Sequence, residues 1–306
     1  MCERLSRWPA AALDVPRCAG RVAHLITQLA DNDLGTVAWA RARAGFDLLV
    51  VARNDFASRK LLRRGFWEGD HIAAIEKLEA NTSSWHGGGN TARRYLDIGA
   101  NVGYHTLLAA SKGFVVDAFE VVPRNAALIN VSLCANPRLE PTVTLRRLGL
   151  SSRPRACTFV SSVQNEADAI ARCDVARADD FRQAGYTVRG EFMMGTMSTM
   201  LSHSYWLAKI DVEGHEVEVL SADGADGYFR RFGIRHILAE SWPEDGAPGA
   251  RGALLARLVE LGYSTVRTVD QAASLRTMLG PIFDPRAPPR AVLTRRGPVD
   301  VLGSHY

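Results

Sequence analysis

Apolar and polar positions alternate with two different periods between residue 91 and about residue 242. Short apolar runs predict strands near 94–98, 114–119, 142–149, 156–161, 206–210 and 235–240. Between them, helical spacing of apolar residues predicts helices near 103–112, 123–135, 214–222 and 225–232. Strands that alternate with helices typically pair in a parallel sheet. The pattern therefore predicts an α/β fold.

The regions on either side of this core have patterns of their own. Apolar residues recur at helical spacing in two early segments, at Leu25, Ile26 and Leu29 and at Ile72, Ile75 and Leu78. The polar, glycine-rich residues 81–90 are typical of a linker. After residue 242 an amphipathic helix over 249–261 and strands over 263–269 and 291–294 are predicted. We expect an N-terminal helical or mixed lobe (1–90) and a larger domain (91–306), with its core at 91–242 and closing elements at 243–306.

Composition and charge narrow the possible classes. Apolar residues make up 47% of the 306 residues and charged residues 23%, which is the balance of an ordinary globular protein. No apolar run approaches the roughly 18 residues of a membrane-spanning helix. The net charge is +4 and the basic residues are spread along the chain, so charge neither implies nor excludes a nucleic-acid partner. We expect no such partner.

The five cysteines are odd in number and widely spaced, at Cys2, Cys18, Cys134, Cys157 and Cys173. This spacing predicts neither a zinc site nor a disulfide framework. Free cysteines are typical of a reducing compartment, so we expect an intracellular, cytoplasmic location, with organelle targeting left open. No apolar block of a secretory signal follows Arg4 and Arg7.

A glycine-containing turn follows the first predicted strand of the core. Asp97 ends that strand, and Gly99, Asn101 and Gly103 follow before the next helix begins. Such a turn lets backbone N–H groups approach a ligand closely. A dinucleotide site has G-x-G-x-x-G, and here Asn101 replaces the second glycine, which disfavours a pyrophosphate. Asp97 is suited to hold an amino group by a charge-assisted hydrogen bond.

The next predicted strand ends on an acid. Glu120 lies 17 residues after Gly103, where a carboxylate can accept hydrogen bonds from both ribose hydroxyls. Strand, glycine turn, helix, strand and acid together predict the nucleoside-binding half of a Rossmann-like fold.

A third cluster follows the strand predicted at 206–210. Asp211, Glu213 and His215 stand in an acidic loop at a strand end that should face the ligand crevice. These residues could orient and deprotonate a substrate hydroxyl. No metal is predicted outright, although Asp211 and Glu213 are also suitable oxygen ligands for a divalent cation. Solvated helix-capping roles for Glu213 and His215 stay open.

Three blocks together resemble the FkbM family of S-adenosylmethionine-dependent methyltransferases. They are Asp97 to Gly103, the pair Phe119-Glu120, and Lys209 to Glu216. The likeness spans roughly residues 91–242, about half of the chain, and the last block is the most specific. Gly65-Phe66-Trp67-Glu68 is a weaker likeness to the segment that precedes the domain in that family.

The resemblance implies a fold, a cofactor and a set of roles. It implies a Rossmann-like seven-stranded methyltransferase sheet with helices on both faces, S-adenosyl-L-methionine as cofactor, and O-methylation of a hydroxyl or carboxyl on a small molecule, lipid or glycan. The methionine end would contact Asp97, Gly99, Asn101 and Gly103, and the ribose would contact Glu120. The adenine would lie near Gly149 and Leu150, and the transferred methyl beside Asp211 and Glu213.

Two departures from the family pattern are visible. Family members often carry proline directly after the acid of the second strand, whereas here Val121 and Val122 precede Pro123. The family often has a Thr-Leu-Asp-Ser-Leu-like block before the fourth strand, and the block Thr196 to Leu201 has no aspartate. Residues 164–193 match nothing recognisable.

Other functions remain as alternatives. A nicotinamide-dependent oxidoreductase is disfavoured by the missing G-x-G-x-x-G. A methyltransferase-like domain that binds a partner without catalysis is disfavoured because Asp97, Glu120 and Asp211 are all present. An amino-directed nucleic-acid methyltransferase would carry an Asn- or Asp-Pro-Pro-Tyr/Phe block where the acidic loop stands. The identity of the acceptor and the oligomeric state are open.

Overall fold

The computed structural model describes residues 15–30, 37–52, 55–69, 72, 75–76, 93–162, 170–173, 186–241, 250–263, 266–268, 289–294 and 299–305. Within this part of the chain, no helix is long and apolar enough to cross a membrane. The predicted strand after residue 263 and the predicted helix around Leu78 lie partly outside the described residues.

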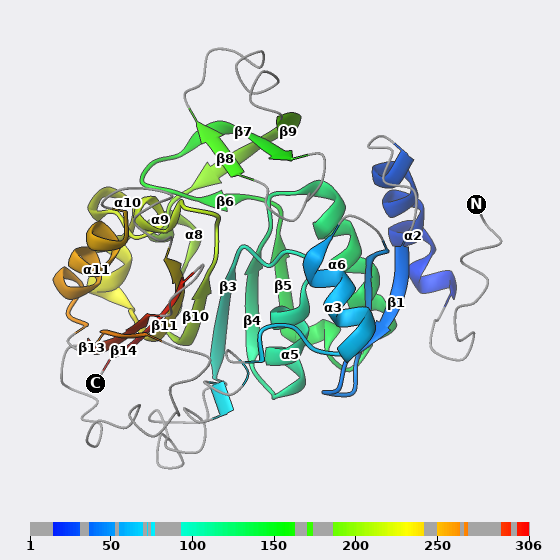
Figure 1. Ribbon diagram of the computed structural model, residues 1–306, viewed down its shortest axis with the longest axis horizontal. Coiled ribbons are helices and arrows are strands. Elements are labelled where there is room, and N and C mark those ends of the chain that lie inside the picture. Colours follow the sequence, from blue (N-terminus) through cyan, green and yellow to red (C-terminus); the bar gives the residue numbers. More distant parts are fainter. Residues whose placement is uncertain are drawn as a thin grey trace.

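An eight-stranded sheet forms the centre of the molecule, in the order β12-β13-β14-β11-β10-β3-β4-β5 (Figure 1). Its strands are β3 (Arg94–Ile98), β4 (Val115–Phe119), β5 (Val143–Arg146), β10 (Tyr205–Ile210), β11 (Ile234–Ser241), β12 (Val266–Thr268), β13 (Pro289–Thr294) and β14 (Val299–His305). The five strands from β11 to β5 are parallel, and β14 is antiparallel to β11. The predicted α/β fold with a parallel sheet is confirmed, whereas the seven-strand count is not, because the described residues contribute eight strands to this sheet.

The strand order reverses beside β3, which lies between β10 and β4. In parallel sheets a ligand crevice opens at such a reversal, outside the carboxyl ends of the strands. All six residues of β10 are buried, as expected for a parallel strand covered on both faces. Its sequence is Tyr-Trp-Leu-Ala-Lys-Ile, in which Lys209 is the one charged residue and is buried with the others.

Two groups of helices cover the two faces of the sheet (Figure 1). One contains α5 (Tyr104–Ser111) and α6 (Pro123–Ala135), and the other contains α9 (Glu216–Val219), α10 (Ala222–Arg231) and α11 (Ala250–Glu260). The buried apolar residues correspondingly form two large clusters. Pro123 stands in the first turn of α6, where its missing N–H costs no hydrogen bond. The predicted helix over 214–222 is shorter than expected, because only α9 is regular there.

The N-terminal segment packs on the first of these layers. It contains α2 (Val15–Ala30), the hairpin β1 (Val37–Arg41) and β2 (Asp47–Val51), and α3 (Phe56–Arg64). Leu25 and the strand residues Leu48 to Val51 are buried in the same cluster as Leu107 and Leu128. The predicted N-terminal helix is therefore confirmed at α2, and this segment shares a core with the sheet.

A second sheet stands at one end of the central one (green, top of Figure 1). Its order is β6-β9-β7-β8, with β6 (Gly149–Leu150), β7 (Arg155–Ser162), β8 (Ile170–Cys173) and β9 (Tyr186–Gly195). The strand predicted over 142–149 is therefore split between β5 and β6, and the one predicted over 156–161 belongs to this second sheet. Strands β8 and β9 lie in the stretch that matched nothing. The remaining short helices are η1 (Glu140–Thr142) and α8 (Met197–Met200), the latter closed by a capping box from Thr196 to Thr199.

Two disulfides correct the prediction that the cysteines stay unpaired. Cys18 of α2 pairs with Cys134 of α6, and Cys157 of β7 pairs with Cys173 of β8. The first pair is 116 residues apart in sequence, so only the fold brings it together. The expectation of a reducing compartment rested on unpaired cysteines and loses that support.

We expect Cys134→Ser to lower the free energy of unfolding by about 2–5 kcal/mol, because the lost cross-link closes a long loop in the unfolded chain. Urea unfolding of the oxidised protein measures the change. Cys2→Ser is the control and should leave the midpoint unchanged. Identical unfolding curves for Cys134→Ser and the unmodified chain would show that this disulfide does not hold α2 to the core.

Candidate functional site

Three strand ends are joined at the carboxyl edge of the central sheet. The Asp211 N–H donates to the carbonyl of Ile98 at 3.0 Å, which joins the ends of β10 and β3. The N–H groups of Gly99 and Ala100 both donate to the carbonyl of Phe119 at 3.0 Å, which joins β3 to β4. These bonds place the glycine turn, the acid after β4 and the loop after β10 around one point.

Gly99 is required where the turn touches the loop after β10. Its φ of +83° lies in the left-handed region, and a Cβ there would collide with the backbone carbonyl oxygen of Asp211. Any other residue would push these two strand ends apart. The glycine therefore serves the packing of two loops as well as the approach of a ligand.

Glu120 is fixed by the backbone on both of its oxygens. Oε2 accepts the N–H of Asn101 at 2.7 Å, and Oε1 accepts the N–H of Val122 at 2.8 Å. The residue is 4% exposed. Burial raises the pKa of Glu120 to about 7, and the two N–H groups offset part of that rise.

A pocket opens at this edge of the sheet, among the three strand ends. Eight of the sequence-predicted residues line it, namely Gly99, Asn101, Glu120, Gly149, Leu150, Asp211, Glu213 and His215. The apolar side chains of Ala171, Phe192 and Met194 come from the second sheet and complete the wall.

Two predicted cofactor residues are not part of this lining. Asp97 is fully buried behind the turn, and its Oδ2 accepts the hydroxyl of Thr106 at 2.5 Å. Gly103 is the N-cap of α5, and a Cβ there would lie 2.7 Å from the side chain of Ile129. Gly103 therefore packs α5 against α6.

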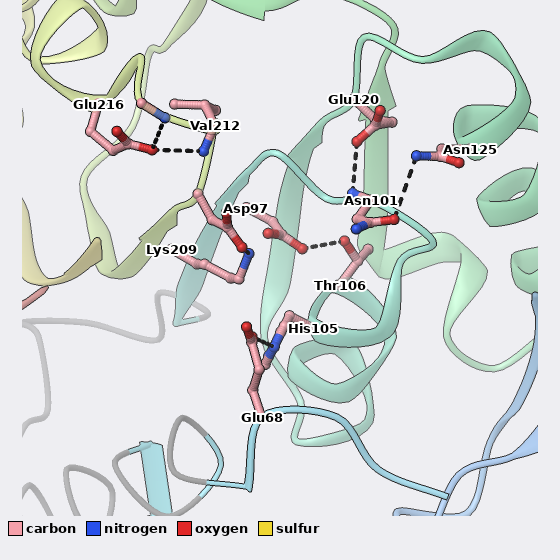
Figure 2. A network of polar contacts seen from close by, with 12 residues as sticks. Glu68, Asp97, Asn101, His105, Thr106, Glu120, Asn125, Lys209, Val212 and Glu216 are labelled. Carbon is pink, nitrogen blue, oxygen red and sulfur yellow. Dashed lines mark hydrogen bonds and ion pairs between the residues drawn. The ribbon is translucent and has the colours of Figure 1, made fainter. Parts of the chain in front are cut away.

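The acidic loop, residues 211–216, is shaped by a glutamate that the sequence reading did not single out. Oε1 of Glu216 accepts the N–H of Val212 at 3.0 Å and of Gly214 at 3.3 Å (Figure 2). Burial raises the pKa of Glu216 to about 7. Glu213, in the middle of the loop, has a φ of 55°. The feature of the sequence that could have predicted this arrangement is a glutamate two residues after a glycine, at the start of a helix.

Asp211 pairs with a buried lysine, which the sequence reading also missed. Lys209 Nζ lies 2.6 Å from Asp211 Oδ2. Burial alone would lower the pKa of Lys209, but the carboxylates of Asp211, Glu68 and Asp97 outweigh it, so the pKa lies well above its ordinary value. A lysine inside an otherwise apolar strand was the available signal, because a buried charge needs a partner.

Asp211, Glu213 and Glu240 each have a carboxylate oxygen within 4.8 Å of the others, a spacing that a divalent ion could bridge. Asp211 and Glu213 were the metal candidates in the sequence, and Glu240 joins them from the end of β11. Acidic groups also gather without a metal, so this spacing alone assigns no ion.

His215 lies at the pocket wall beside Ser151. Its Nε2 is 3.2 Å from Ser151 Oγ, which also accepts an N–H of Arg155 at 3.0 Å. Burial lowers the pKa of His215. Glu218 opposes this shift, while Arg155 and Arg172 reinforce it. The ring is therefore neutral at neutral pH.

The chain belongs to the FkbM methyltransferase family. The family model, described as the methyltransferase FkbM domain, matches residues 97–265, more than half of the chain. The match includes the glycine turn, Glu120 and the acidic loop. No curated protein gives a significant sequence match.

Solved structures with detectable likeness are distant. The METTL16 methyltransferase domain is 10% identical, with a TM-score of 0.41 and 97% of each chain covered. Monomeric WbdD is 14% identical, with a TM-score of 0.39, and the match covers 78% of this chain but only 42% of WbdD. Precorrin-6y C5,15-methyltransferase from Geobacter metallireducens is 12% identical, with a TM-score of 0.36 and 77% and 87% covered. Similarities this weak carry no argument about substrate.

Alanine substitutions at Gly99 and Gly113 separate the backbone strain at Gly99 from its close contact with Asp211. Gly113 has a φ of +84°, nearly that of Gly99, but nothing lies within 4 Å of a Cβ built there. We expect Gly113→Ala to cost about 1 kcal/mol from backbone strain alone. Gly99→Ala should cost about 3 kcal/mol or more, since the collision with Asp211 adds to that strain. Urea unfolding measures both changes, and equal costs would contradict the close contact.

Proposed function

We propose that this chain is an S-adenosylmethionine-dependent O-methyltransferase. The observation that carries the proposal is the position of Glu120, whose carboxylate is fixed at the rim of the pocket by two backbone N–H groups. Each oxygen keeps lone pairs with which it can accept a ribose hydroxyl. When bound, the cofactor supplies an electrophilic methyl group on a sulfonium.

The residues around the pocket suit such a nucleoside. The Asn101 N–H is already bonded to Glu120 and so is not offered to a pyrophosphate, which disfavours a dinucleotide. Gly149 and Leu150 form one wall, and Phe192 and Met194 add an apolar surface of the kind that covers an adenine ring. Asp211 and Glu213 lie across the pocket at the end of β10, where we place the transferred methyl.

The acceptor must lose a proton if it is a hydroxyl, and two residues were candidates for the base. Asp211 is already paired with the ammonium of Lys209. His215 is neutral at neutral pH and lines the pocket. We therefore assign His215 as the general base. In the tautomer whose Nε2–H donates to Ser151 Oγ, Nδ1 is left to accept the proton.

The roles of the remaining residues follow from their positions. Asp211 orients the acceptor and Glu216 holds the loop that carries both groups, so reacting atoms are kept in line, which supplies much of the rate in a displacement. We propose a hydroxyl or carboxyl on a small molecule, lipid or glycan as the acceptor. No nucleic-acid partner is proposed.

Calorimetric titration with S-adenosylhomocysteine, with NADH run in parallel, tests the cofactor. The acceptor class is tested by incubation with methyl-labelled S-adenosylmethionine and a panel of hydroxyl, carboxyl and amine compounds. We expect binding of S-adenosylhomocysteine alone and label in ethers or esters. Binding of NADH alone, or label confined to amines, would refute the proposal.

The pKa of Glu120 predicts how cofactor binding depends on pH. Only the ionised carboxylate can accept both hydroxyls, and with a pKa of about 7 the ionised fraction falls from about 90% at pH 8 to about 10% at pH 6. The affinity for S-adenosylhomocysteine should therefore fall by up to about 10-fold between pH 8 and pH 6. Glu120→Gln should bind more weakly and lose this dependence. The same pH slope in both proteins would refute the assignment of Glu120.

His215→Gln should slow methyl transfer to a hydroxyl acceptor from the panel by about 100-fold or more, because the proton acceptor is lost. Binding of S-adenosylhomocysteine should change little. His203→Gln is the matched control, since His203 lies on the surface bonded to Ser202 and outside the pocket lining. If both variants keep the normal rate, His215 is not the base.

A further inference from the structure

A second polar cluster lies behind the pocket, where β3, β10, α5 and the segment after α3 meet (Figure 2). Lys209 and Asp97 are direct neighbours in the pairing of β10 with β3. Glu68, from the segment after α3, pairs through Oε2 with Nε2 of His105 at 2.7 Å. Their side chains are largely buried, with 4% of Lys209, 6% of His105 and 16% of Glu68 exposed.

Acidic side chains gather around one buried cation in this cluster. The carboxylates of Glu68, Asp97 and Asp211 all act on the ammonium of Lys209. Carboxylates that are held close together out of water favour N–H donors that carry a positive charge. The cluster is therefore suited to contact the charged amino group of a ligand.

One atom of the cluster is also unsatisfied. Within the described part of the chain, Asp97 Oδ1 is buried and makes no hydrogen bond, whereas Oδ2 is bonded to Thr106. Figure 2 shows the unbonded oxygen on the side of Lys209. Buried polar atoms are nearly always paired, so an unpaired carboxylate oxygen points to a missing donor.

The backbone of Glu68 links it to the pocket. Three described residues other than glycine have a positive φ, namely Glu68 (47°), Asn101 (52°) and Glu213 (55°). Asn101 and Glu213 both line the pocket. A left-handed glutamate is uncommon and costs energy, and such conformations gather at functional sites where surrounding contacts enforce them. The pair with His105 is one of the contacts that hold Glu68 in place.

We propose that Glu68 is a further cofactor-binding residue, which together with Asp97 receives the α-ammonium group of the methionine end. This inference rests on the proposed function. Asp97 supplies its unbonded oxygen, and His105 acts as a positioning residue that holds the Glu68 carboxylate toward Asp97 and Lys209. The ammonium offers three N–H donors and a positive charge, which suit the unbonded oxygen of Asp97 and the carboxylate of Glu68. The segment that precedes the matched family domain thereby completes the site.

Comparing the binding of two nucleosides distinguishes a role of Glu68 in cofactor binding from a general loss of structure. S-adenosylhomocysteine carries the amino-acid end, and 5′-methylthioadenosine shares its adenine, ribose and thioether but lacks that end. We expect Glu68→Gln to weaken S-adenosylhomocysteine about 10- to 100-fold by calorimetry, as for a lost bond to a charged group. Its affinity for 5′-methylthioadenosine should stay within about 2-fold of the unmodified chain's.

Two further variants serve as controls for this experiment. Glu68→Asp keeps the charge but shortens the reach, and should give a smaller loss that is again confined to S-adenosylhomocysteine. Glu76→Gln is the control, because the Glu76 side chain is 58% exposed and its pair with Lys112 is long, at 3.5 Å. Equal losses for both nucleosides, or no loss for either, would overturn the role of Glu68. If the unmodified chain binds neither nucleoside, the proposed function fails, and this inference fails with it.

Discussion

The close backbone contact between Gly99 and Asp211 is the constraint on which the site depends. It is possible only because position 99 has no side chain, and it sets the distance between the turn after β3 and the loop after β10. The hydrogen bond from Asp211 to Ile98 and the two bonds to Phe119 extend the same join to β4. This junction sets where Glu120, after β4, and Asp211, after β10, lie relative to the glycine turn.

Burial then decides what the charged groups around the junction can do. The same desolvation raises the pKa of the Glu120 and Glu216 carboxyls and lowers that of the His215 imidazole. Lys209 is the exception, because neighbouring carboxylates more than offset its burial. Burial therefore yields carboxyls that titrate near neutral pH and a neutral imidazole, whereas neighbouring carboxylates keep Lys209 an ammonium.

The second sheet gives the pocket its apolar wall. β6 continues from the end of β5, and β7, β8 and β9 fold back so that Phe192 and Met194 reach the cavity. The disulfide between Cys157 and Cys173 joins β7 to β8, beside Ala171 at the pocket. An added sheet at the carboxyl edge is thus part of the site as well as an insertion in the fold.

The sequence by itself determined the strand-turn-helix core and the three chemical blocks, because helix and strand periodicity and motif spacing are local properties. It placed α6 at its observed bounds, and it picked eight residues that line the pocket. It did not determine that β5 and β6 belong to different sheets, that Cys18 meets Cys134, or that Glu68 lies beside Lys209 and Asp97. Those pairings join residues that are adjacent only after the chain has folded, so no local pattern encodes them. Tertiary packing also decided which side chains are buried, and with that their charge states.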